Sequence, residues 1–247
     1  MNVLICNDDG INSIGIKALS NEFSREHNVL VVAPDGNRSA CAHSLSINKK
    51  VILRKIDEEQ YRAYSISGTP ADCVKIARLI FPDFKPDVVI AGINNGYNLG
   101  TDVLYSGTVS IACEASFFGH TSFAFSAKNL SENILKIYCK YASKIVKIFT
   151  DGFLKGEIYN VNFPFVPAEE IKGIKITSLG KQIYTDRYIF DEDGYKLVGE
   201  LVDHSENVKD CDIEWIKKGY ITITPILFDK TDYKNINKVK KKCKKLL

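Results

Sequence analysis

The chain has 247 residues, of which 45% are hydrophobic, and its formal net charge is only +3. This length suits one α/β domain with an appended element, or two small domains, with enough apolar residues for a real core. Part of the positive charge lies in the lysine-rich end 240–247, which is more typical of a solvated helix than of a site for an acidic partner. No apolar run approaches the ~20 residues that cross a bilayer. We therefore expect neither a nucleic-acid polymer nor a membrane as partner.

The seven cysteines are scattered and include no C-x-x-C pair, which argues against a zinc ribbon and against a redox dithiol. Most of them lie in apolar runs, where a free thiol behaves as a small hydrophobic group. The first residues lack the basic region, apolar stretch and cleavage site of a secretory signal, so we expect a cytoplasmic protein.

Strand and helix patterns alternate through the first 150 residues. Strands are predicted for the runs Val3–Cys6, Val29–Ala33, Val51–Arg54, Ala63–Ile66, Val88–Ala91 and Ser122–Ser126. Helices are predicted over 14–23, 70–81, 108–118 and 131–149. Apolar strands that alternate with helices predict a mainly parallel sheet covered on both faces, and therefore an α/β fold of three layers.

The segment Thr69-Pro70-Ala71-Asp72 has the pattern of a helix start. Thr69 can cap the helix, Pro70 suits its first position, and Asp72 follows three residues after the cap. We interpret this segment as a structural cap more than as a catalytic element.

The second half of the chain has a different pattern. Strands are predicted over 159–163, 174–178 and 221–226, and a long polar hairpin over 184–202 around the turn dipeptide Asp193-Gly194. A hairpin this polar has little core of its own, so it either projects onto a neighbouring subunit or lies over the functional site. Tyr184 and Arg187 could accordingly reach a substrate or serve a subunit interface.

The adjacent carboxylates Asp8 and Asp9 directly follow the first apolar strand. Two like charges at the end of a buried strand are costly, and a divalent cation would remove that cost. Ligands of open parallel sheets bind where the loops after the strands converge, which would bring Ser39 and Asn94 to the same place. Two carboxylates with neutral oxygens suit a hard cation such as Mg²⁺ or Mn²⁺. The alternative is that the two carboxylates only form a turn and cap the next helix.

The segment 105-YSGTV-109 precedes a predicted helix. Free backbone N–H groups and the positive end of the helix dipole make such a start a ready anion site. Gly107 would let the backbone approach an anion closely, and Ser106 and Thr108 can donate hydroxyl groups. A cation beside this site indicates phosphate chemistry, although the same residues would also serve as a plain helix start.

Several long motifs together resemble, in order and spacing, the SurE family of metal-dependent nucleotidases. They are NDDG (7–10), APDGNRSACAHSLSI (33–47), SGTPADCV (67–74), GINNGYNLG (92–100) and DVLYSGTVSIACE (102–114), with weaker matches at NVNFP (160–164) and GYITITP (219–225). The resemblance implies a Rossmann-like core, here 1–180, one divalent cation per subunit, and homodimers or homotetramers that exchange a C-terminal extension, here 181–247.

The resemblance also implies roles for single residues. The metal ligands fall on Asp8, Asp9, Ser39 and Asn94, the last rather than its neighbour Asn95. Residues expected around the phosphate are Asn98, Ser106, Gly107 and Thr108. The hairpin departs from the family, because 190-FDEDGYKLVGE-200 replaces a Pro-Arg-Gly type of turn followed by aromatic residues that include Trp.

The expected function is hydrolysis of nucleoside 5′-monophosphates, with 3′-monophosphates and short polyphosphate as further candidate substrates. Asp8 and Asp9 are the catalytic candidates, either by orienting water or accepting its proton, or by forming a phospho-aspartyl intermediate. A nucleotide sensor that does not hydrolyse its ligand is the alternative. NDDG in place of G-x-G-x-x-G disfavours a dinucleotide-dependent oxidoreductase. His43 could assist proton transfer or order its loop; His27, His120 and His204 receive no role.

Overall fold

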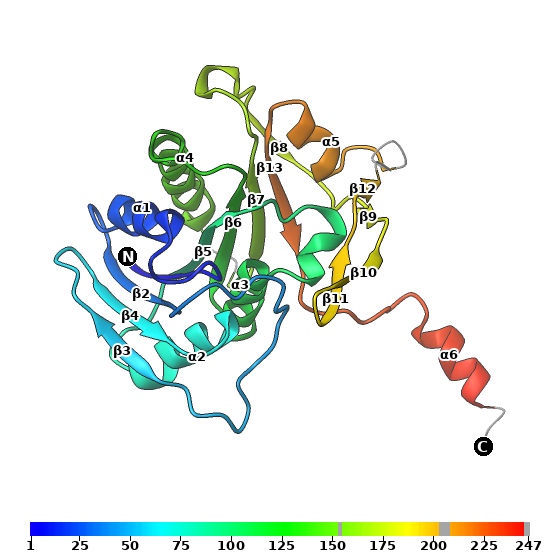
Figure 1. Ribbon diagram of the computed structural model, residues 1–247, viewed down its shortest axis with the longest axis horizontal. Coiled ribbons are helices and arrows are strands. Elements are labelled where there is room, and N and C mark those ends of the chain that lie inside the picture. The colour runs from blue at the N-terminus through cyan, green and yellow to red at the C-terminus, as the bar shows by residue number, and fades with distance from the viewer. Residues whose placement is uncertain (153–154, 203–207, 245–247) are drawn as a thin grey trace.

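A computed structural model describes residues 1–152, 155–202 and 208–244. Its centre is a nine-stranded sheet (Figure 1). The strands are β1 (Asn2–Cys6), β2 (Asn28–Pro34), β3 (Leu53–Ile56), β4 (Arg62–Ile66), β5 (Val88–Asn95), β6 (Thr121–Ala127), β7 (Ile158–Phe163), β8 (Ile174–Ile176) and β13 (Ile221–Ile226). Their order is β3-β4-β2-β1-β5-β6-β7-β13-β8. The strands from β4 to β7 in this order run parallel, whereas β3 and β13 run antiparallel to β4 and β7.

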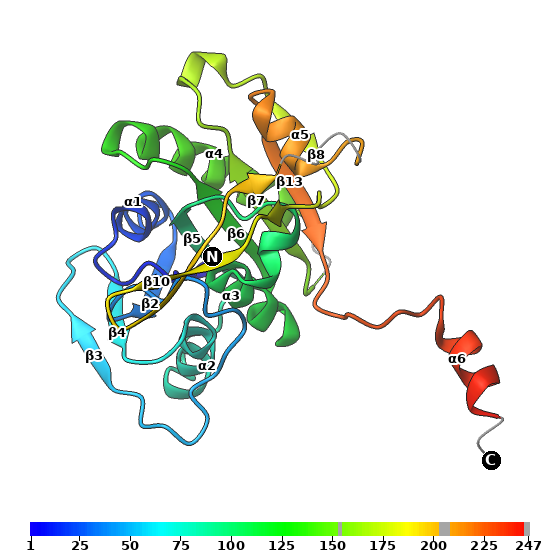
Figure 2. The same cartoon turned by 45° about the vertical axis from the view of Figure 1, so that its right-hand side comes forward.

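Helices cover both faces of the sheet (Figure 2). The helices α1 (Ile14–Phe23) and α4 (Glu132–Thr150) lie on one face, and α2 (Pro70–Ile80) and α3 (Gly107–Phe117) lie on the other. Along β1, Val3 and Ile5 belong to the apolar cluster under α1 and α4, whereas Leu4 and Cys6 belong to the cluster under α2 and α3. A strand buried on both faces has no polar alternation, which is why these strands appear as continuous apolar runs. The prediction of a three-layer α/β fold is confirmed.

The predicted cap of α2 is confirmed in detail. The Asp72 N–H donates to Thr69 Oγ1 at 3.3 Å, and the Thr69 N–H donates to Asp72 Oδ2 at 2.9 Å. The same two side chains also hold the preceding loop, because Thr69 Oγ1 lies 2.8 Å from the Ser44 carbonyl oxygen and the Ser46 N–H donates to the Asp72 carboxylate.

β5 is longer than predicted. The apolar run ends at Ala91, but pairing with β6 continues to Asn95 after a shift of register between Ala91 and Asn94. Gly92 lies at this shift with φ +120°, a region that favours glycine, and a Cβ atom there would lie 2.3 Å from the Phe125 carbonyl oxygen. The shift is a tertiary feature, so the polar residues beyond the apolar run had no signal of a strand.

The second half contains elements that the sequence patterns did not predict. They are a short helix, α5 (Asp212–Lys217), and a 3₁₀ turn, η2 (Ala168–Glu170). A further unpredicted 3₁₀ turn, η1 (Gly100–Leu104), follows β5 in the first half. The side chain of Asp212 accepts the N–H groups of Gly100 and Gly180, both at 2.8 Å. The helix α5 begins at Asp212, whose buried carboxylate joins two loops that are far apart in the sequence. No local sequence pattern predicts such a contact.

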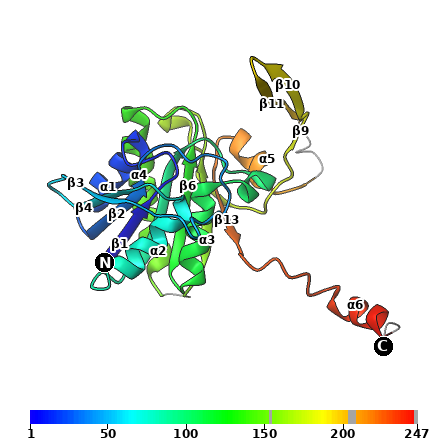
Figure 3. The same cartoon turned by 60° about the horizontal axis from the view of Figure 1, so that its bottom comes forward.

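The predicted hairpin is present but divided. Its outer part pairs β10 (Arg187–Asp191) with β11 (Gly194–Val198), and its base pairs β9 (Ile183–Tyr184) with β12 (Leu201–Val202). Asp191 pairs with Gly194, so the turn residues are Glu192 and Asp193, one position earlier than expected. The hairpin projects from the body (Figure 3).

The last described helix, α6 (Ile236–Cys243), also lies apart from the body, at the end of an extended segment (Figures 1–3). Within the described residues, no helix has both the length and the apolar character needed to cross a membrane. His204 lies outside the described residues.

The contact between α1 and β5 gives a test of the fold. A Cβ atom on Gly15 would lie 2.1 Å from the Ile93 carbonyl oxygen. We therefore expect Gly15→Ala to lower the free energy of unfolding in urea by about 2 kcal/mol or more, because overpacking against backbone outweighs the better helix propensity of alanine. Gly194→Ala is the matched control, since nothing lies within 4 Å of its added Cβ. Equal stability of the two variants would contradict this packing.

Candidate active site

The loops after β1, β2 and β5 meet at the carboxyl ends of these strands. The Arg38 N–H donates to the Asp8 carbonyl oxygen at 2.7 Å, which joins the second loop to the first. The Asn95 N–H donates to Asp9 Oδ2 at 3.1 Å, which joins the third loop to the first. Gly10 and Gly36 approach so closely that a Cβ on Gly10 would lie 3.0 Å from the Gly36 carbonyl carbon. The predicted convergence of these loops is therefore observed.

The turn that carries the two carboxylates is held by Asn7, which the sequence analysis had not singled out. Its amide nitrogen donates to the Gly10 carbonyl oxygen at 3.0 Å, and its amide oxygen accepts the Gly10 N–H at 3.2 Å. The side chain of Ser13 accepts the Ile16 N–H and caps α1. Because Ser13 is the cap, neither Asp8 nor Asp9 caps this helix. The alternative interpretation is therefore wrong as to the cap, although the pair does lie in a turn.

Asp8 is only 4% exposed and lies against the start of α3. Thr108 Oγ1 donates to Asp8 Oδ1 at 2.5 Å. A Cβ on Gly107 would lie 2.8 Å from both Cβ and Oδ2 of Asp8, so only glycine admits this approach. The pKa of Asp8 is raised to about 6. Burial is the largest cause of this rise, the hydrogen bond from Thr108 opposes it, and the charge of Asp9 adds to it. The protein thus holds a carboxylate whose charge it does not itself neutralise.

Asp9 is partly buried, and burial raises its pKa against the hydrogen bond from the Asn95 N–H. Among the described residues, no Lys, Arg or His side chain lies within ion-pair distance of Asp8 or Asp9. The nearby guanidinium of Arg38 is paired with Asp35 at 2.8 Å instead. The two adjacent carboxylates therefore lack a cationic partner from this part of the chain.

The neutral candidates Ser39 and Asn94 are sequence neighbours of Arg38 and Asn95, whose N–H groups bind Asp8 and Asp9. Ser39 directly follows the Arg38 peptide that is bound to Asp8, and its N–H donates to Asn37 Oδ1 at 2.7 Å. Asn94 Nδ2 donates to the Gly96 carbonyl oxygen at 2.9 Å. This bond engages the nitrogen of the amide, and no described group donates to its Oδ1. The oxygen of Asn94 is thus the atom left available to a ligand.

These donors fit a divalent cation. All four predicted ligands offer oxygen atoms, which Mg²⁺ and Mn²⁺ prefer, and the raised pKa values of Asp8 and Asp9 mark charges that a cation would stabilise. The described part of the chain contains no group of three or more His, Cys, Asp or Glu side chains placed to hold a metal ion. This agrees with the predicted set, because two of its four members, Ser39 and Asn94, are neutral.

The residues predicted to bind phosphate come from two segments, the start of α3 and the loop after β5. Ser106 caps α3 by accepting the Val109 N–H at 3.0 Å, and Gly107 and Thr108 begin the helix beside Asp8. Asn98 lies instead in a buried network at the ends of β6 and β7, where its amide nitrogen donates to Ser126 Oγ at 2.7 Å. The helix start thus has the two features an anion site needs, first-turn N–H groups and a glycine.

A polar cluster links the second loop to α2 and α3. His43 Nε2 lies 2.7 Å from Glu114 Oε2, and Lys75 Nζ lies 2.6 Å from Glu114 Oε1. Burial alone would raise the pKa of Glu114, but its hydrogen bonds with His43 and Lys75 outweigh that effect and lower the pKa. His43 is therefore engaged in ordering its loop, which is one of the two roles expected for it.

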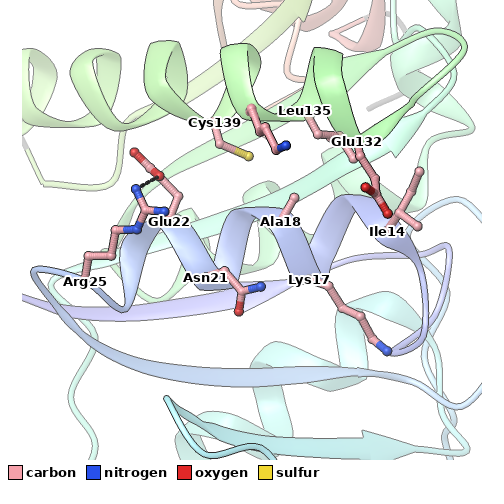
Figure 4. A pocket seen from close by; sticks show the side chains of 10 residues that line it. Ile14, Lys17, Ala18, Asn21, Glu22, Arg25, Glu132, Leu135 and Cys139 are labelled. Atoms are coloured by element: carbon pink, nitrogen blue, oxygen red, sulfur yellow. Dashed lines mark ion pairs between the residues drawn. The ribbon is translucent and has the colours of Figure 1, made fainter.

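A groove of about 370 Å³ lies elsewhere, between α1 and α4 (Figure 4). Its lining includes Lys17, Arg25, Glu132 and Cys139, and none of the candidate ligands. It belongs to the other helical layer, so we do not assign the substrate to it.

Comparison with known proteins decides the family. The family model described as survival protein SurE matches residues 3–186. This chain belongs to the SurE family. A 5′-nucleotidase SurE of Clostridium botulinum (strain 657 / Type Ba4) is 43% identical over 242 residues, covering 94% of this chain and 95% of the relative. Another, from the strain Alaska E43 / Type E3, is 42% identical over 250 residues and covers 98% of this chain and 99% of the relative.

A solved SurE structure agrees with the fold. The crystal structure of the SurE protein from Aquifex aeolicus superposes with a TM-score of 0.83 at 37% identity, covering 98% of this chain and 99% of that one. The resemblance inferred from the five long motifs is confirmed, and it extends through the C-terminal part of this SurE chain.

The raised pKa of Asp8 predicts a pH dependence for the metal-free protein. The folded state binds the proton of Asp8 more tightly than the unfolded chain, whose pKa is near 3.8. The bound proton therefore adds up to about 3 kcal/mol to the free energy of unfolding. This contribution is fully present below pH ~4 and is lost as the pH rises through about 6. We expect Asp8→Asn, after EDTA treatment, to be more stable than the wild type at pH 8 and similar at pH 4, as measured by urea unfolding. A constant difference between these pH values would contradict the buried charge.

Proposed function

We propose that this protein is a divalent-metal-dependent phosphomonoesterase that releases phosphate from nucleoside 5′-monophosphates. The observation that carries the proposal is the contact between Asp8 and the start of α3 through Thr108 and Gly107. An anion at the helix start would lie beside a cation held by the adjacent carboxylates, an arrangement that suits metal-assisted release of phosphate. The curated relatives at 42–43% identity are named 5′-nucleotidase SurE, which supports the same activity.

In this proposal, different side chains of the site bind the metal ion, bind the phosphate and orient the attacking water. Asp8, Asp9, Ser39 and Asn94 hold one Mg²⁺ or Mn²⁺, which when bound would polarise the phosphoryl oxygens and help to activate water. The first-turn N–H groups at Gly107 and Thr108 bind the phosphate, together with Ser106 and Asn98. Asp9 is more exposed than Asp8, and its N–H partner Asn95 engages one of its two oxygens. The other oxygen is available to orient the attacking water or to accept its proton.

The assembly and the compartment are also part of the proposal. We assign the projecting hairpin and α6, within the extension 181–247, to contacts between subunits of a homodimer or homotetramer. The hairpin exposes large apolar side chains that a body of this size would otherwise bury: Tyr188, Phe190, Tyr195 and Leu197. All seven cysteines are free thiols, which suits the reducing cytoplasm.

A nucleotide sensor would use the same site without hydrolysis, and phosphate release separates the two functions. We expect purified protein to release phosphate from AMP, to lose this activity in EDTA, and to regain it with added Mn²⁺ or Mg²⁺. A panel of 5′- and 3′-mononucleotides and short polyphosphate would define the substrate range. Binding of AMP without release of phosphate, in the presence of either cation, would identify a sensor and reject the enzymatic function.

Asp8→Asn tests the assigned carboxylate. The substitution keeps the shape of the side chain and an acceptor for Thr108, but it removes the charge. We expect loss of turnover with the fold intact, as judged by circular dichroism, and at least a tenfold weaker affinity for Mn²⁺, consistent with the roughly 10–100-fold effects seen even for the partners of metal ligands. Full activity in this variant would refute the role of Asp8.

Thr108 offers a matched pair of variants. Thr108→Val removes the hydroxyl that donates to Asp8, and Thr108→Ser keeps it. We expect the valine variant to lose about 100-fold in kcat/KM for AMP, since a hydrogen bond to a charged group contributes about 1.5–3 kcal/mol. The serine variant should lose less than about threefold. Similar losses in both variants would mean that the methyl group matters and the hydrogen bond does not.

A further inference from the structure

Two asparagines of β7 hold the backbone of a single residue. Asn162 Oδ1 accepts the Asn98 N–H at 2.9 Å, and Asn162 Nδ2 donates to the Asn98 carbonyl oxygen at 3.0 Å. Asn160 Nδ2 donates to the same carbonyl oxygen at 2.8 Å. Both asparagines are 0% exposed, and Asn98 is 5% exposed. We call this arrangement the asparagine clamp.

The clamp fixes a loop that has no other regular structure. Residues 96–99 lie between the end of β5 and the 3₁₀ turn η1. The Gly96 N–H donates to the Ala127 carbonyl oxygen and the Leu99 carbonyl oxygen accepts the Asp102 N–H, whereas Asn98 has no backbone partner among the described residues. Asn162 satisfies both the backbone donor and the backbone acceptor of Asn98, in the manner of a neighbouring strand. Buried amide groups without hydrogen-bond partners are unfavourable, so the loop and the clamp depend on each other.

The clamp holds the backbone of Asn98 and leaves part of its side chain free. One amide hydrogen of Asn98 is engaged by Ser126 Oγ. No described group donates to Asn98 Oδ1, and the second amide hydrogen has no described acceptor. The side chain predicted to bind phosphate is therefore placed by three hydrogen bonds to the Asn98 backbone and by one from its own amide nitrogen.

We propose that Asn162 is a positioning residue for phosphate binding, which acts by holding the Asn98 peptide and thereby the Asn98 side chain. This inference rests on the proposed function, since it needs Asn98 to serve the phosphate site. Asn160 supports the same carbonyl oxygen with a single bond and has the smaller part. Asn160 and Asn162 are the first and third residues of the segment 160-NVNFP-164, so this segment holds the loop that carries Asn98.

Thr222 provides a matched control on the same sheet. It pairs directly with Asn162 in the register between β13 and β7, and it is equally buried. Its hydroxyl has no hydrogen-bond partner among the residues that the structure describes. Thr222→Val therefore changes a buried polar side chain beside Asn162 without touching the clamp, and any effect that it shares with an Asn162 variant is a general effect of the core.

The experiment compares Asn162→Asp, Asn160→Asp and Thr222→Val with the wild type. The probe is inorganic phosphate, titrated by calorimetry in saturating Mn²⁺, and Mn²⁺ affinity and Tm are measured in parallel. Asn162→Asp keeps an acceptor for the Asn98 N–H but removes the donor to the Asn98 carbonyl oxygen. We expect phosphate Kd to rise about tenfold, in line with partners of other active-site ligands, with Mn²⁺ Kd within twofold of the wild type. Asn160→Asp should shift phosphate Kd in the same direction by less, and Thr222→Val should not change it.

A double-mutant cycle separates positioning from general stability. If Asn162 acts through Asn98, then Asn98→Ala should weaken phosphate binding, and adding Asn162→Asp to it should weaken binding little further. A lowered Tm with unchanged phosphate Kd, or equal losses from Asn162→Asp in both backgrounds, would overturn the proposal. If Asn162→Asp does not fold, Asn160→Asp and its combination with Asn98→Ala decide by the same criteria. Phosphate binding without AMP hydrolysis by the wild type would reject the proposed enzyme while still testing the clamp.

Discussion

The adjacent carboxylates of Asp8 and Asp9 are the constraint around which the rest of this protein is arranged. Both are partly or fully buried, both have raised pKa values, and no described Lys, Arg or His pairs with them. Hydrogen bonds from Thr108 and from the Asn95 N–H orient the pair without neutralising it. Such a site is costly without a partner charge and would become favourable with a doubly charged ion bound, so that stability and the proposed function would depend on the same charge.

Backbone approach, more than side-chain packing, brings the parts of this site together. Gly107 lets the start of α3 reach Asp8, Gly10 lets the first loop reach Gly36, and Gly15 lets α1 reach the β5 loop. Each of these contacts would be blocked by a single Cβ atom. The asparagines of β7 extend the same principle, because they hold the Asn98 loop by its peptide groups. The site therefore tolerates little change in its glycines and buried amides, even where they touch no ligand.

The body and the extension differ in how they are stabilised. The body buries most of its apolar residues in two large clusters, one on each face of the sheet, and the rest in two small ones. The hairpin and α6 expose theirs, among them Phe190, Tyr195 and Val239. A subunit interface would account for that exposure. The residues of 190–200 that differ from the family pattern would then contact the neighbouring subunit.

The sequence by itself determined the layers, the order of the elements through α4, and the motifs that identify the family. It could do so because fully buried strands, amphipathic helices and the cap at Thr69 are local patterns of polarity and spacing. The turn of Asn7, the extension of β5 to Asn95, the helix at Asp212 and the asparagine clamp were decided only in the tertiary structure. The turn of Asn7 rests on local bonds to Gly10, but the others depend on a hydrogen bond or a close approach between residues far apart in the chain, such as Asn98 with Asn162. No local sequence pattern predicts such a distant partner.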